Sequence, residues 1–141
     1  MATTRTATTQ WQGSLIQGAG QVTLESSGLG TFDVTWASRA ETPNGRTSPE
    51  ELIAAAHSAC FSMALSHALT QGGNEPAALT TTAEVTFQPG EGITGIVLRV
   101  RGNVPGMDRE AFISAAEGAK VNCPVSKALT GTTITLDADL G

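Results

Sequence analysis

Two cysteines, Cys60 and Cys123, are the residues of this 141-residue chain whose side chains are most able to do chemistry. A thiolate is both a nucleophile and a metal ligand. The first ten residues are mostly threonine and alanine and lack the apolar run of a signal peptide, so we expect a cytoplasmic protein whose thiols stay reduced. A permanent disulfide is therefore disfavoured, and a catalytic or metal-binding role is open.

Cys60 lies within an apolar, helix-forming stretch. Burial there raises the pKa of a thiol, and many free cysteines are simply small core residues. To act as a nucleophile, Cys60 needs a cation nearby. The candidates near it in the sequence are His57, His67, Arg39 and Arg46.

Cys123 has a different setting, because Asn122-Cys123-Pro124 places it at the start of a predicted helical turn. A helix N-terminus favours a thiolate through the helix dipole. Local chemistry alone therefore makes Cys123 the more reactive thiol, and the alternative is that it is an ordinary helix cap.

The clearest helix start is Ser48-Pro49-Glu50-Glu51. It combines a capping serine, a proline at the first helical position and a glutamate three residues after the cap. The helix is predicted to run to about Leu69 and to end at Gly72-Gly73. Small and apolar residues occupy nearly all of its faces, which predicts a buried central helix.

The remaining elements are predicted from alternating β-forming residues, turn residues and caps. They are strands over Thr3–Trp11, Gln21–Glu25 and Thr31–Trp36, a loop over Arg39–Thr47, strands over Leu79–Phe87 and Ile93–Arg101, a helix capped by Asp108, a helical turn from Cys123 to Leu129 and a strand over Thr132–Leu140. We expect one α+β domain over residues 1–141, in the order βββ-α-ββ-α-α-β, with antiparallel sheets around the long buried helix.

Composition excludes several classes of protein. The net charge is −5, charged residues make up 15% of the chain, and the basic residues are scattered, so nucleic acid is not an expected partner. No stretch is apolar for the length that a membrane span requires, so no membrane association is expected. Arg99 and Arg101 alternate on a predicted strand and are expected on its solvated face.

Three segments together resemble the OsmC/Ohr family of peroxidases. The segment from Thr47 to Leu65, which contains His57-Ser58-Ala59-Cys60, resembles the first family signature. Ala119 to Ser126 resembles the second-cysteine motif, and Val104 to Asp108 matches the segment between the two. The residues beside both cysteines are similar to the osmotically inducible branch.

The resemblance implies a cysteine-based peroxidase that needs no metal or organic cofactor. It implies that Cys60 is the peroxidatic thiolate and that Cys123 resolves its sulfenic acid as a disulfide. It further implies that Arg39 stabilises the Cys60 thiolate and that Glu50 holds Arg39. Arg46 is the alternative to Arg39, because the loop from Arg39 to Ser48 is about one residue longer than the common family pattern.

The family resemblance and helix geometry both predict an intertwined homodimer. Glu50 and Cys60 are ten residues apart on one predicted helix, which separates them by about 15 Å along the axis and turns them by roughly 80°. Arg39 and Glu50 would therefore serve the Cys60 of a partner subunit more easily than their own.

The expected reaction reduces organic hydroperoxides to alcohols, in defence against oxidative and osmotic stress, with a lipoyl-type or thioredoxin-type dithiol as reductant. The apolar residues near Cys60 favour bulky peroxides over hydrogen peroxide. Three alternatives remain. They are a redox sensor without turnover, a zinc protein that uses Cys60, Cys123, His57 and His67, and a chain in which both cysteines only pack.

Overall fold

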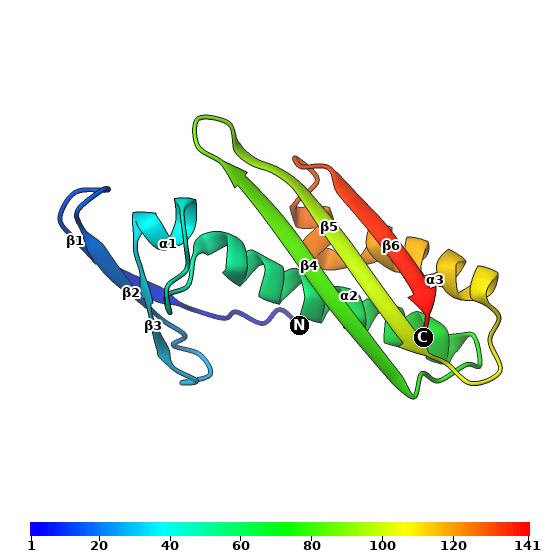
Figure 1. Ribbon diagram of the computed structural model, residues 1–141. Helices are drawn as coiled ribbons and strands as arrows, with labels where there is room; N and C mark the ends of the chain where they lie inside the picture. Colours follow the sequence, from blue (N-terminus) through cyan, green and yellow to red (C-terminus); the bar gives the residue numbers. More distant parts are fainter. The chain divides into compact units, whose positions relative to one another are not determined.

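The computed structural model describes residues 1–141, which form two compact units, Met1–Leu52 and Ile53–Gly141 (Figure 1). We refer to them as unit 1 and unit 2. The long helix α2, Pro49–Gln71, begins in unit 1 and continues into unit 2. The predicted α+β class is confirmed, with two small sheets and one long helix.

Unit 1 contains the predicted three-stranded meander. Its strands are β1 (Thr8–Gln12), β2 (Ala19–Thr23) and β3 (Thr31–Val34), paired antiparallel in the order β1-β2-β3. Gly20 lies opposite Trp11 on β1, and a Cβ at Gly20 would come within 2.6 Å of the Trp11 ring. The register of this sheet therefore requires a glycine there.

A short helix that the sequence analysis did not predict follows β3. Helix α1, Trp36–Ala40, occupies the end of the expected strand and the start of the expected loop. The Thr35 hydroxyl accepts from the Ser38 amide and the Ser38 hydroxyl accepts from the Thr35 amide, both at 3.0 Å. This reciprocal cap begins a helix where Trp36 alone favours a strand, and it corrects the predicted element order.

Helix α2 begins as predicted, because the Ser48 hydroxyl accepts from the Glu51 amide at 3.1 Å. Its burial is narrower than predicted. Within this chain the fully buried residues recur at every fourth position: His57, Phe61, Leu65 and Leu69. This spacing makes one stripe along the helix, whereas Met63 on another face is 74% exposed. The prediction of a helix buried on nearly every face is therefore wrong for the single chain.

Helix α2 is also the one helix that is long and apolar enough to cross a membrane, so the prediction that no stretch is apolar for that length is wrong. Its buried stripe packs in the core of unit 2 with residues of a sheet and of α3. Its apolar character thus has a role in packing within the protein.

The sheet of unit 2 has the order β4-β5-β6, formed by Ala78–Gln88, Gly92–Asn103 and Ile134–Leu140. The β4–β5 hairpin is antiparallel, as predicted, but β5 and β6 run parallel. The expectation of antiparallel sheets alone is therefore wrong. The reason is the connection: the chain crosses over through helices between β5 and β6, which returns β6 in the direction of β5.

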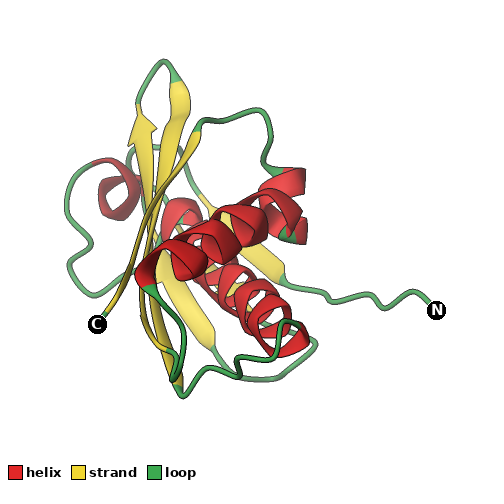
Figure 2. Cartoon of the chain, turned by 90° about the vertical axis from the view of Figure 1, so that its right-hand side faces the viewer, coloured by secondary structure: helices red, strands yellow, loops and turns green.

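That connection consists of α3 (Arg109–Asn122) and α4 (Pro124–Ala128). Asp108 caps α3 as predicted, by accepting from the Ala111 amide at 2.8 Å. Cys123 is at once the C-cap of α3 and the N-cap of α4. The helices of unit 2 lie on one face of its sheet (Figures 1 and 2), and the core between them holds side chains such as Phe61, Leu98 and Phe112.

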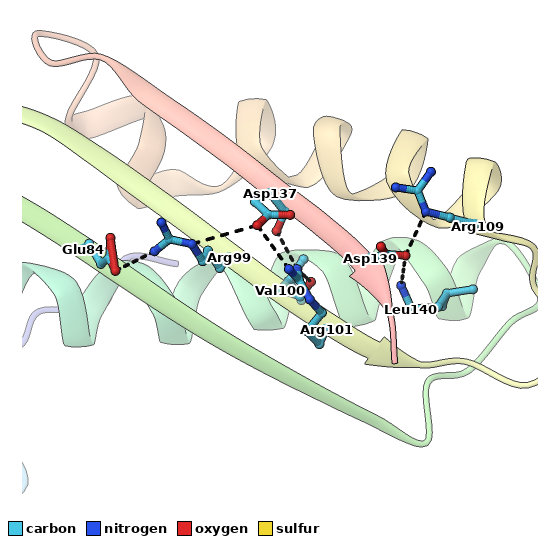
Figure 3. Close-up of polar contacts among 8 residues, drawn as sticks. All are labelled: Glu84, Arg99, Val100, Arg101, Arg109, Asp137, Asp139 and Leu140. Atoms are coloured by element: carbon cyan, nitrogen blue, oxygen red, sulfur yellow. Dashed lines mark hydrogen bonds and ion pairs between the residues drawn. The ribbon is translucent and has the colours of Figure 1, made fainter.

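The other face of this sheet is charged. Arg99 and Arg101 alternate with the buried Leu98 and Val100 on β5, as predicted. Arg99 pairs with Glu84 on β4, and both arginines approach Asp137 on β6 (Figure 3). All of these charged side chains are more than 40% exposed. They form a solvated ladder away from the cysteines.

Candidate active site

The structure brings the two cysteines together in unit 2. Cys60 comes from the middle of α2, and Cys123 comes from the junction of α3 and α4. Both are free thiols, and their sulfurs lie within hydrogen-bonding reach of each other. The two cysteines are 63 positions apart in the sequence, and the packing of α2 against α3 brings them close together in space.

Cys123 is completely buried. Burial raises the pKa of its thiol, but the neighbouring Cys60 thiol, the nearby Ser126 and Val125 amides and the Ser126 hydroxyl lower it, and the net shift is downward. The amides belong to the first turn of α4, although the Cys123 side chain makes no capping hydrogen bond to that helix. Local sequence features ranked Cys123 as the more reactive thiol, and its pKa shifts in the direction that a helix N-terminus favours.

Cys60 is only partly buried. Its pKa is raised, first by burial and then by the hydrogen bond that it shares with Cys123. Within unit 2, therefore, Cys60 is the more accessible sulfur and Cys123 is the more acidic one. A Cys60 thiolate needs an additional positive charge.

His57 does not supply that charge. The imidazole is fully buried, and its Nε2 lies 2.7 Å from the Ser126 hydroxyl oxygen. Burial lowers the pKa of His57, which keeps the ring neutral. His67, the other candidate histidine, is exposed on α2. The chain contains no group of three or more His, Cys, Asp or Glu side chains that could hold a metal ion, which does not favour the zinc alternative.

The predicted arginine and glutamate also meet, in unit 1. Arg39 on α1 donates from Nε and Nη2 to the Glu50 carboxylate in the first turn of α2, at 3.0 to 3.2 Å. The Glu50 side chain is 7% exposed and that of Arg39 is 31% exposed. This two-pronged contact fixes the plane of the guanidinium. Arg46 is exposed and donates to the Asn44 carbonyl at 3.5 Å.

Arg39 lines an apolar hollow of about 340 Å³ in unit 1. The other lining residues are mainly apolar: Thr9, Trp11, Leu15, Val22, Val34, Thr35, Trp36, Pro49 and Leu52. A guanidinium beside apolar walls suits a ligand with a polar head and a hydrocarbon body.

Ser126 is the residue near the cysteines to which the sequence analysis assigned no role. It is 4% exposed and contacts both His57 and Cys123. Its position three residues after a helix N-cap is a usable signal, because a side chain at that position reaches back to the cap.

An α+β fold that brings two reduced cysteines together in an apolar core defines a thiol-redox protein. The chain belongs to the OsmC family: residues 42–137 match the family described as OsmC-like protein. Peroxiredoxin OsmC of Escherichia coli is 43% identical over 133 residues, which cover 92% of each chain.

Other relatives agree with this membership. The organic hydroperoxide resistance protein of Xanthomonas axonopodis pv. citri is 34% identical over 86 residues, 60% of this chain and 61% of that protein. The crystal structure of the organic hydroperoxide resistance protein OhrB of Bacillus subtilis is similar to this fold with a TM-score of 0.70. It is 27% identical and matches 95% of this chain and 98% of its own.

Proposed function

We propose that this protein is a cysteine-based peroxidase that reduces organic hydroperoxides to alcohols, with Cys60 as the attacking thiolate and Cys123 as the resolving thiol. The observation that carries the proposal is the pair itself: two reduced sulfurs in contact, one accessible and one buried. Cys60 is partly exposed and Cys123 is buried, which supports Cys60 as the thiol that attacks first. The names of the relatives, a peroxiredoxin and organic hydroperoxide resistance proteins, support the same activity.

The reaction has two chemical steps on the enzyme. The Cys60 thiolate attacks the terminal oxygen of ROOH, the O–O bond breaks, and the alkoxide takes a proton to leave as ROH. Cys60 becomes a sulfenic acid. Cys123 then attacks the Cys60 sulfur, a disulfide forms and water leaves. An external dithiol reduces the disulfide and completes the cycle, and we propose a lipoyl-type or thioredoxin-type donor.

Arg39 is the cation that we propose for the Cys60 thiolate and for the alkoxide that forms. The support is the buried Glu50 carboxylate, which holds the guanidinium rigidly. Since Glu50 and Cys60 are ten residues apart on α2, a helical rise separates them by about 15 Å along the axis. The Arg39 that serves each Cys60 therefore belongs to a second copy of the chain, and the working form is a homodimer.

The apolar hollow beside Arg39 supports organic hydroperoxides as substrates rather than hydrogen peroxide. In this reading the hydrocarbon part contacts the hollow and the peroxide group meets the guanidinium. We further propose that residues 1–141 act as one functional domain in the cytoplasm, in defence against oxidative and osmotic stress.

Steady-state reduction of cumene hydroperoxide and of hydrogen peroxide with a dithiol donor tests the proposal. We expect turnover by wild type, with cumene hydroperoxide as the better substrate. Cys60→Ser should lose activity on the order of a thousandfold or more, as expected for a lost nucleophile. Cys123→Ser should consume about one equivalent and then stall. A wild-type protein that oxidises once without turnover would instead be a redox sensor.

A further inference from the structure

Three polar side chains form a continuous buried chain through the core of unit 2. The His57 Nε2 lies 2.7 Å from the Ser126 Oγ, and Ser126, three residues after Cys123, lies close enough to the Cys123 sulfur for its hydroxyl to lower the pKa of that thiol. His57 and Cys123 are fully buried and Ser126 is 4% exposed. Polar contacts in so dry a setting are stronger than in water, and each partner depends on the others.

Local helix geometry explains how the chain of contacts forms. Cys123 is the N-cap of α4 and Ser126 is the third residue of that helix, a position from which a side chain reaches back to the cap. His57 is three residues before Cys60 on α2 and therefore lies one turn away on a neighbouring face. These polar side chains thus connect α2, the helix that carries Cys60, to Cys123.

The hydrogen atoms shared by His57, Ser126 and Cys123 can be placed in one consistent way when Cys123 is a thiolate. A thiolate only accepts, so the single Ser126 hydroxyl proton is donated to sulfur. The Ser126 oxygen then accepts from His57, whose proton must be on Nε2. The Nδ1 atom is left without a proton, and Nδ1 is a buried atom with no hydrogen-bond partner. No N–H group is therefore left buried without an acceptor.

We infer that Ser126 and His57 are positioning residues that hold Cys123 as a thiolate, ready to attack oxidised Cys60. This inference rests on the proposed peroxidase function and concerns its second step. Cys60 is the titratable group that contacts the Cys123 sulfur directly, and His57 reaches it through Ser126. The other buried residues of the surrounding core cluster are apolar.

The step that these residues assist is balanced as follows. The Cys123 sulfur attacks the Cys60 sulfur, the S–S bond forms and the S–O bond of the sulfenic acid breaks. The Cys123 sulfur is oxidised and the Cys60 sulfur is reduced. The departing hydroxide takes a proton equivalent to the one that Cys123 released and becomes water. Ser126 and His57 neither gain nor lose a proton overall.

The first experiment titrates the Cys123 thiolate by its ultraviolet absorbance in a Cys60→Ser background. Removing the hydroxyl with Ser126→Ala should raise the Cys123 pKa by about one unit, since a hydrogen bond to a charged group is lost. Ser126→Thr retains the hydroxyl and should keep the pKa close to that of the parent. An unchanged pKa in a folded Ser126→Ala protein, or an equal rise with threonine, would overturn the inference.

Two further variants apply the same test from the histidine. His57→Phe removes the donor and should raise the Cys123 pKa by less than Ser126→Ala does, whereas His57→Gln can still donate and should raise it least. If Ser126→Ala does not fold, the comparison of His57→Phe with His57→Gln is sufficient by itself. Equal Cys123 pKa values in these two variants would overturn the inference. Ser62→Ala is the matched control. It removes a hydroxyl on α2 that contacts Thr81 at 2.7 Å and does not affect the Cys123 thiol, and it should leave the pKa unchanged.

The second experiment follows a single turnover of the protein with both cysteines present. In Ser126→Ala the Cys60 sulfenic acid should persist about threefold longer near neutral pH, because a roughly tenfold loss of thiolate is partly offset by its higher nucleophilicity, while the formation rate is unchanged. A sulfenic acid that disappears as fast as in wild type contradicts the inference. Failure of the proposed function is seen separately, as absence of turnover in wild type, and the thiolate titration does not depend on turnover.

Discussion

Unit 1 and unit 2 differ in how they are stabilised. Unit 2 has a continuous core of fully buried side chains, among them Phe61, Leu98 and Phe112. In unit 1, Val22 is the one large apolar side chain that is buried, while Trp11 and Phe32 are each at least 40% exposed. Unit 2 can hold its two sulfurs in place with its own core, whereas large apolar side chains of unit 1 stay partly exposed in the single chain.

The same difference separates the parts of the proposed site. The sulfurs lie in the well-packed unit, and the cation lies in the unit with the smaller core. The proposed homodimer would account for both features, because a second copy would cover the apolar surface of unit 1 and place its own Cys60 beside Arg39. Substitutions in each unit test this difference.

The first prediction compares the packing of the two units. Phe112→Ala should lower the free energy of unfolding by about 3–5 kcal/mol, because it empties a fully buried position in unit 2. Phe32→Ala, at a 41% exposed position in unit 1, should cost clearly less. Denaturant unfolding at equal protein concentration measures both, and equal losses would mean that unit 1 is as well packed as unit 2.

The second prediction concerns the cation. Arg39→Met should lower kcat/KM for an organic hydroperoxide by about 100-fold, the effect of losing one preorganised stabilising group. Arg46→Met is the matched control, because Arg46 is an exposed arginine of the same unit without a carboxylate partner, and it should retain activity. The opposite result would assign the role of the cation to Arg46.

Mixing variants shows which copy supplies Arg39. Arg39→Met and Cys60→Ser dimers, unfolded together and refolded, should recover roughly a quarter of wild-type activity, since half of the dimers then hold one complete site. No recovery would show that Arg39 serves the Cys60 of its own chain.

The third prediction concerns His57 and pH. Burial lowers its pKa below the ordinary value of 6.5, so the unfolded chain takes up a proton that the folded chain does not. Stability is complete above pH 6.5 and falls as the pH is lowered, by up to about 1.4 kcal/mol per pH unit. His57→Phe should remove this dependence, as measured by unfolding from pH 7 to pH 5, with an exposed-site His67→Phe variant as control. An unchanged slope in His57→Phe would show that His57 titrates equally in both states.

Local signals predicted most of the elements, and long-range contacts explain the rest. The caps Ser48 and Asp108 predicted both long helices, because capping depends on neighbouring residues. The parallel pairing of β6 depends on which strand lies beside it after a crossover, which no local pattern contains. Helix α1 was missed because its cap, Thr35 and Ser38, lies within a stretch of β-forming residues.

The candidate site also has parts that local signals predict and parts that depend on long-range contacts. The family resemblance implied the roles of Cys60 and Cys123, and local chemistry alone ranked Cys123 as the more reactive thiol. No local pattern could show that Ser126 meets His57, because that contact spans 69 residues. The narrow buried stripe of α2 was also not predictable, since small and apolar residues occupy its exposed faces too.

The smallest effect is expected on the charged face of the unit 2 sheet. Arg99 pairs with Glu84 and approaches Asp137, and all three side chains are more than 40% exposed (Figure 3). Arg99 holds the pKa of Glu84 below its usual range by a hydrogen bond, but water and salt screen such exposed pairs. Arg99→Ala should therefore leave the denaturation midpoint unchanged within experimental scatter, at low and at high salt, and peroxide turnover should also be unchanged.

A clear loss of stability in Arg99→Ala that disappears at high salt would contradict this expectation, because it would mean that the charged ladder contributes to the stability of unit 2. The comparison between the units would then need revision, since the greater stability of unit 2 would depend on its surface charges as well as on its core. If the midpoint does not move, packing on the helix side of the sheet is enough to keep Cys60 and Cys123 in contact. The strength of that contact would then depend on core residues such as Phe112.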